Sequence, residues 1–182
     1  MKLPVTSAET FKRYLSFIRS WDRKKNISYH LQYIEFLYKI KKLHNPSSTT
    51  RSLLIKTIIV EYFTVIEAIL DALLCQLYVD TGEGILAPID IDEYTRAERL
   101  LGLAKKYRII NVDIHSQLGR IKSTRNKIHI KRPHKNQPLE YEGYTANLLG
   151  EYEESYQNFL AFLFDKNGVG SNDYPWPWRI EV

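Results

Sequence analysis

The short segment from Arg125 to His129 holds the side chains of this chain that are best suited to chemistry. The imidazole of His129 moves a proton near neutral pH, and the guanidinium of Arg125 stabilises charge on a phosphate. The two residues are separated by about 40° around a helix, so both side chains would reach the same anion. Asn126 would add a hydrogen bond to the phosphate or to an RNA 2′-hydroxyl. These residue types predict phosphodiester cleavage that needs no metal ion.

Two simpler explanations apply to the same residues. An Arg and a His at helical spacing often occur by chance, and a His near the C-terminal end of a helix favours the negative end of the helix dipole. The basic run from Lys131 to Lys135 would equally suit a solvated exit from that helix. The residue pattern by itself leaves catalysis and these explanations open.

Basic side chains are concentrated around this segment. The chain has 182 residues and a net charge of +5, which permits an anionic partner without requiring one. Residues 120–135 contain seven Lys and Arg and no Asp or Glu. This local imbalance predicts contact with nucleic acid through Lys122, Lys127, Lys131 and Arg132.

Helical periodicity places Arg125 on the apolar side of its helix. At 100° per residue, Arg125 falls inside a narrow apolar stripe formed by Ile114, Leu118, Ile121 and Ile128. A guanidinium is rarely buried without a partner, because its desolvation must be offset. We therefore expect Arg125 to be paired inside the protein or to lie at the floor of a cleft.

Glu67 and Asp71 are candidate acids for orienting this site. They are spaced i,i+4 on the polar sector of a long apolar helix, where they would pair with Arg125 or orient His129. The alternative is an acidic edge that is exposed to solvent.

Helix signals also run through the rest of the chain. Thr6 and Glu9 fit a capping box ahead of a helix that carries apolar residues from Phe11 to Ile18. A long apolar helix over about residues 50–80 would be the central one. Further helices are expected over 28–43, after Asp92, from Asn111 toward Pro133 and around 148–163. The sequence therefore predicts an all-α bundle of about five to six helices with a long central helix.

A single domain is expected, because one hydrophobic core commonly serves about 100–200 residues. We place the helical bundle in residues 1–167 and an extended aromatic tail in residues 168–182, where closely spaced prolines prevent a helix. Trp176 and Trp178 would either engage a partner or fold back onto their own domain, and folding back is the more frequent outcome for such tails.

Several classes of function are disfavoured. The N-terminus has no apolar leader, and charged residues such as Lys56 and Glu61 interrupt the most apolar stretch, which predicts a cytoplasmic protein without membrane contact. Cys75 is the only cysteine, and the five histidines form no metal-ligand pattern. We therefore expect no disulfide, no metal site and no cofactor.

The segment Ser123-Thr124-Arg125-Asn126-Lys127-Ile128-His129, following a long apolar helix that contains Glu67, resembles the HEPN superfamily. This superfamily consists of small helical bundles, many of them metal-independent ribonucleases, whose Arg-polar…His motif lies at a homodimer cleft. Its members include toxins of toxin–antitoxin and abortive-infection systems, and some have lost catalysis. Here three residues separate Arg125 from His129, fewer than the family usually has, and Ile130 stands where the histidine would normally be.

The resemblance implies a homodimeric endoribonuclease that cleaves RNA at the cleft between its two subunits, with Arg125, Asn126 and His129 as catalytic residues. It further implies an antitoxin or a nucleotidyltransferase as a partner. The alternative is a catalytically inactive module of the same fold that binds RNA or another protein.

Overall fold

The computed structural model describes residues 4–44, 46–82, 93–126, 143–170 and 174–178. Within these ranges the chain forms six helices and no strand, which confirms the all-α class. The helices are α1 (Ala8–Tyr14), α2 (Trp21–Leu43), α3 (Ser48–Thr81), α4 (Glu93–Lys106), α5 (Val112–Asn126) and α6 (Ala146–Lys166).

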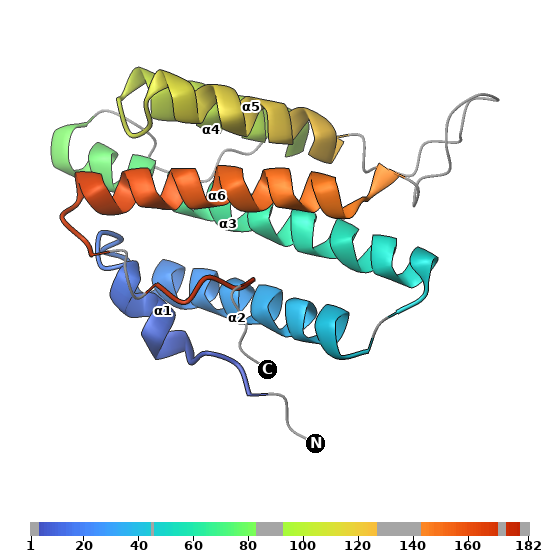
Figure 1. Ribbon diagram of the computed structural model, residues 1–182. Helices are drawn as coiled ribbons and strands as arrows, with labels where there is room; N and C mark the ends of the chain where they lie inside the picture. The colour runs from blue at the N-terminus through green and yellow to red at the C-terminus, as the bar shows by residue number, and fades with distance from the viewer. Residues whose placement is uncertain (1–3, 45, 83–92, 127–142, 171–173, 179–182) are drawn as a thin grey trace.

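The helices are arranged in three levels around α3 (Figure 1). α3 and α6 lie side by side in the middle, with α4 and α5 on one side of them and α1 and α2 on the other. Contacts between neighbouring elements join α3 to α2, α4, α5 and α6. The predicted role of α3 as the central helix is therefore confirmed.

α3 owes this position to apolar side chains that surround most of its circumference. A helix that is apolar on all sides must be covered on all sides. Its buried residues span more than four turns: Ile55, Ile58, Ile59, Tyr62, Phe63, Val65, Ile66, Ile69, Leu70, Asp71, Ala72 and Leu74. The helix ends at Gly82, whose φ of 73° is the left-handed conformation that glycine adopts without strain.

The N-terminal helices begin at different residues from those predicted. Ser7, not Thr6, caps α1, because its hydroxyl accepts a hydrogen bond from the Thr10 amide at 3.2 Å. The Thr6 amide instead donates to the carboxylate of Glu35 on α2 at 2.8 Å. α2 begins at Trp21 rather than near Ser28, and its first turn and a half, up to Asn26, has no buried residue. A solvent-facing start carries no apolar stripe, so periodicity could not reveal it.

The remaining helices agree with the sequence pattern. Four predicted apolar residues of α4 are buried: Ala97, Leu100, Leu101 and Ala104. The side chain of Asn111 accepts a hydrogen bond from the Ile114 amide at 2.8 Å, which confirms it as the cap of α5. Thr145 caps α6 in the same way. The predicted cap at Asp92 lies outside the described residues.

Residues 174–178 fold back onto the bundle, as expected for an aromatic tail. Tyr174 and Trp176 are 3% and 6% exposed. The Tyr174 ring lies 5.1 Å from Tyr14 of α1 and 5.3 Å from Phe164 of α6. In Figure 1 this segment runs beside α1 and α2 on the α6 side. The aromatic tail thus joins the N-terminal helices to the last one.

Replacing Trp176 with alanine tests this packing. We expect the free energy of unfolding to fall by about 3–5 kcal/mol, because a large buried ring is removed. Trp21→Ala is the matched control, since Trp21 is 57% exposed and its loss should cost less than about 1 kcal/mol. Urea unfolding measures both, and equal losses would contradict the packing described here.

Candidate functional site

α5 is the element that positions the predicted catalytic residues. Ile114, Leu118 and Ile121 are buried, so the predicted apolar stripe is confirmed over the first three turns. The helix continues to Asn126. The backbone of Arg125 therefore lies one helical turn beyond Ile121, on the same face of α5.

Most of the predicted site residues fall outside what the structure describes. The side chains of Arg125 and Asn126 are not among the described side chains, and neither are Ile128, His129, Lys127, Lys131 and Arg132. Their roles therefore stay predictions.

Tyr152 of α6 holds the turn of α5 that precedes Arg125. Its buried hydroxyl donates a hydrogen bond to the main-chain oxygen of Ile121 at 2.5 Å. In an α-helix that oxygen also accepts from the amide four residues later, which here belongs to Arg125. A carbonyl has two lone pairs, so it can accept both bonds. The position of Arg125 along the bundle is thereby tied to α6.

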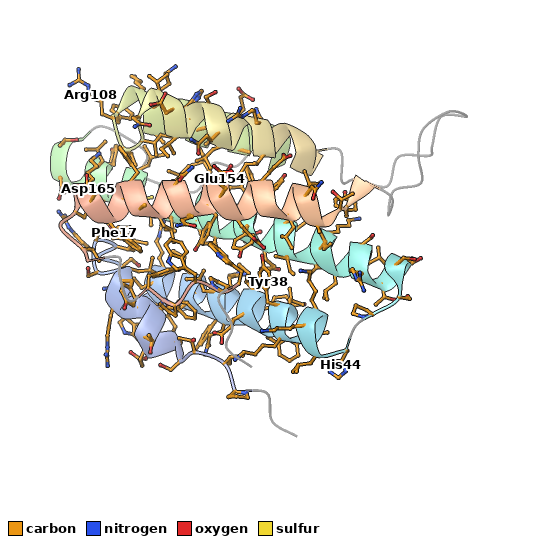
Figure 2. The ribbon with its side chains drawn as sticks, in the orientation of Figure 1. Phe17, Tyr38, His44, Arg108, Glu154 and Asp165 are labelled. Carbon is orange, nitrogen blue, oxygen red and sulfur yellow. The ribbon has the colours of Figure 1, made fainter. Side chains whose placement is uncertain are left out.

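A polar groove of about 410 Å³ lies between α5 and α6 in this region. Across it, the side chain of Asn158 donates to that of Gln117 at 3.2 Å. Glu154 lies on the side of α6 that faces α5 (Figure 2). The groove is lined by Gln117, Arg120, Ile121, Glu151, Tyr152, Glu154, Ser155 and Asn158. Donors and acceptors of both charge signs thus line the groove, which adjoins α5 from Gln117 to Ile121.

Among the predicted nucleic-acid contacts, Lys122 is the one whose side chain the structure describes. Its ammonium forms an ion pair with Glu98 of α4, and its side chain is only 12% exposed. In this arrangement Lys122 links α4 to α5. A phosphate would have to compete with Glu98 for it.

Asp71 has a partner that the sequence did not indicate. Its carboxylate accepts a hydrogen bond from the Arg23 guanidinium of α2 at 2.6 Å, on the side of α3 away from α5. Asp71 is 7% exposed, so the solvated acidic edge does not apply to it. Its other oxygen, Oδ1, has no hydrogen-bond partner among the described residues. Glu67 is half-buried one turn earlier, and its predicted link to Arg125 stays a prediction.

His30 and Glu61 form an acid–imidazole pair that sequence reasoning missed. The Nδ1 atom of His30 lies 2.6 Å from a Glu61 carboxylate oxygen, and the His30 side chain is 42% exposed. A carboxylate on Nδ1 holds the ring in one tautomer and leaves Nε2 to face other groups. The two residues are 31 positions apart on α2 and α3, so only the packing of these helices reveals the pair.

A second polar cluster lies between α2, α3 and α6 and consists of the buried Tyr38 and Tyr62 and the half-buried Glu153. Tyr38 donates to the Glu153 carboxylate, and Tyr62 donates to the Tyr38 hydroxyl at 3.2 Å. Figure 2 shows Tyr38 in the space between α2 and α6. Burial raises the pKa of Glu153 above its ordinary value of 4.5, although the hydrogen bond from Tyr38 and the charge of Lys41 oppose this.

The described residues contain no group of three His, Cys, Asp or Glu side chains that could hold a metal ion. None of the described helices is both long and apolar enough to span a membrane. Cys75 lies beside Arg23, whose guanidinium donates to its sulfur at 3.3 Å.

Comparison of the chain with models of protein families, with curated proteins and with solved structures found no match.

The Arg23–Asp71 pair can be tested by removing one partner and then both. Arg23→Met should lower the free energy of unfolding by about 2–4 kcal/mol, because it leaves a buried carboxylate uncompensated. The double variant with Asp71→Leu should recover much of this loss in urea unfolding. Arg19→Met is the control, since Arg19 pairs with Asp80 on the surface, where solvent screens the pair and its loss should change stability little. A double variant that is less stable than Arg23→Met would contradict the pairing.

Glu153 makes a pH-dependent contribution to stability. Its pKa is raised in the folded protein, so the folded state binds the proton more tightly than the unfolded chain. The contribution is fully present below about pH 4.5 and is lost as pH rises through the folded pKa. Glu153→Gln keeps an acceptor for Tyr38 and removes the charge. The melting temperature of this variant minus that of the unmodified protein should therefore increase from pH 4 to pH 7.

The control is Glu154→Gln, the exposed neighbour on α6. Thermal unfolding at several pH values gives the comparison. A constant difference between Glu153→Gln and the unmodified protein across this range would show that Glu153 does not titrate as described.

Proposed function

We propose that this chain is a HEPN-like, metal-independent endoribonuclease, acting as a toxin or defence component, that cleaves RNA at a cleft between two copies of the chain. The observation that supports the proposal is that α5 continues for one further turn, to Arg125 and Asn126, beyond Ile121, which lines the polar groove between α5 and α6. The all-α bundle with its long α3 is the setting that the resemblance requires.

The start of α6 adds positive potential near the same place. α6 begins at the end of the bundle where α5 ends (Figure 1). The first amides of a helix attract negative charge, and only part of them is satisfied by the Thr145 cap. An RNA phosphate near Arg125 would therefore meet the guanidinium and be close to a favourable helix end.

In the proposed reaction, the 2′-hydroxyl of the RNA attacks the adjacent phosphorus and loses its proton to a base. The bond to the 5′-oxygen breaks, and that oxygen takes a proton from an acid. His129 is the proposed acid or base, and two copies in one cleft would supply one His129 for each transfer. Arg125 and Asn126 stabilise the charge on the phosphate, and Lys127, Lys131 and Arg132 hold the flanking strand. The products are a 2′,3′-cyclic phosphate and a 5′-hydroxyl.

The pathway follows from the same proposal. Such a nuclease would act in the cytoplasm as a homodimer and be held in check by an antitoxin or a nucleotidyltransferase partner. The second candidate is a catalytically inactive module that binds RNA or another protein, which the short spacing of Arg125 and His129 favours.

A ribonuclease assay in EDTA tests the activity. We expect cleavage of RNA to a 2′,3′-cyclic phosphate product, with Arg125→Ala and His129→Ala each lowering the rate by about 10²–10⁴-fold. His134→Ala is the matched control, because this histidine lies beyond Pro133 and has no role in the proposed site. Its rate should equal that of the unmodified protein.

Three results would redirect the proposal. A pure dimer that leaves diverse RNAs intact would exclude the nuclease. Salt-sensitive RNA binding that survives His129→Ala, without cleavage, would indicate the inactive RNA-binding module. Neither binding nor cleavage would leave a protein-interaction role.

A further inference from the structure

We propose that the outer face of α1 and α2 binds single-stranded nucleic acid by stacking bases on Trp21, Tyr29 and Tyr33 and by pairing phosphates with the lysines beside them. This face lies across the bundle from α5 (Figure 1). The inference uses no residue of the segment 120–135, so it does not depend on the proposed RNA cleavage by Arg125 and His129.

Three aromatic side chains on α2 are exposed, whereas most of the other aromatic rings that the structure describes are buried. Trp21 is 57% exposed, Tyr29 49% and Tyr33 43%. Four residues of helix advance about 6 Å, so these residues follow one slowly turning stripe about 18 Å long. The next ring, Phe36, stacks with Tyr33 at an interplanar angle of 21° and supports it from the half-buried side.

Lysine ammonium groups lie over the same rings. Lys12 of α1 and Lys25 of α2 lie 4.9 and 4.8 Å from the centre of the Trp21 ring. Lys25 is also 5.9 Å from the Tyr29 ring. A base that stacks on either ring would take the place of the Lys25 ammonium, which would then pair with the phosphate of the same nucleotide. Two of the three exposed rings, Trp21 and Tyr29, thus have a lysine ammonium within 6 Å of the ring centre.

The charge of this part of the chain fits a polyanion. Residues 8–43 contain nine Lys and Arg against three Asp and Glu, a net charge of +6. The whole chain carries +5, so the remaining residues together carry −1. One of the three acids, Glu9, is already bonded to Lys12 at 2.6 Å. The α1–α2 region is therefore a second basic region of the chain, besides residues 120–135, that would attract a strand of phosphates.

Nucleic acid fits this surface better than a protein does. The cores of protein interfaces are depleted in lysine, whereas sites for single strands combine aromatic rings with a basic track. Here Lys25 lies between Trp21 and Tyr29 on α2, and Lys12 of α1 also contacts the Trp21 ring, so the exposed rings and lysines are mixed rather than divided into an apolar patch and a polar rim. A stripe of about 18 Å accommodates about four nucleotides, the lower end of the usual site size.

The test is fluorescence anisotropy of a labelled oligo-dT with the full-length protein. DNA lacks the 2′-hydroxyl that the proposed cleavage uses, so binding is measured without turnover. Trp21→Ala, Tyr29→Ala and Tyr33→Ala should each weaken binding about 5- to 100-fold, and Trp21→Phe should retain most of the affinity. Lys25→Ala should reduce the dependence of affinity on salt concentration.

Leu53→Ala and Val79→Ala are the controls, because both residues are exposed and apolar but lie on α3. They should bind like the unmodified protein. Unchanged binding in the variant that lacks all three rings would overturn the inference. It would also be overturned if polyglutamate bound as tightly as oligo-dT through the same rings, because the surface would then be a site for an acidic protein.

Discussion

The need to cover α3 on every side is the constraint on which the rest of this structure depends. Its apolar side chains surround most of the helix, so contact with solvent on any side would be unfavourable. α2, α4, α5 and α6 supply the cover. The polar groups that remain on α3 must then find partners across these contacts, as Asp71 does with Arg23 and Glu61 with His30.

The same constraint determines what α5 can present. The apolar stripe of α5 packs against the core as far as Ile121, and the hydrogen bond from the Tyr152 hydroxyl holds that turn in place. The next position on this face of α5 is Arg125, a charged residue that packing against an apolar core does not explain. We expect a guanidinium in line with isoleucines either to be paired inside the protein or to lie at the floor of a cleft.

Local patterns were sufficient to predict the bulk of the helices, because periodicity and caps act within a few residues. The span of α3, the buried stripe of α5 and the Asn111 cap are examples. The start of α2 was missed because its first residues face solvent, and the α1 cap was misassigned because Thr6 bonds to the distant Glu35. Of the candidate site, the sequence could indicate residue types and spacing only. Pairs such as His30 with Glu61 depend on how two helices are rotated against each other, which no local pattern encodes.

The place of Trp176 in the chain affects how the protein emerges from a ribosome. All six described helices precede Tyr174 and Trp176 in the chain, and Tyr174 packs against rings at both ends of that order, Phe11 in α1 and Phe164 in α6. Until they arrive, Phe11, Tyr14 and Phe164 lack part of their cover. Any packing of α1 against α6 that precedes the synthesis of Tyr174 would leave this aromatic surface open to water. Chaperones and neighbouring nascent chains would meet it in that state.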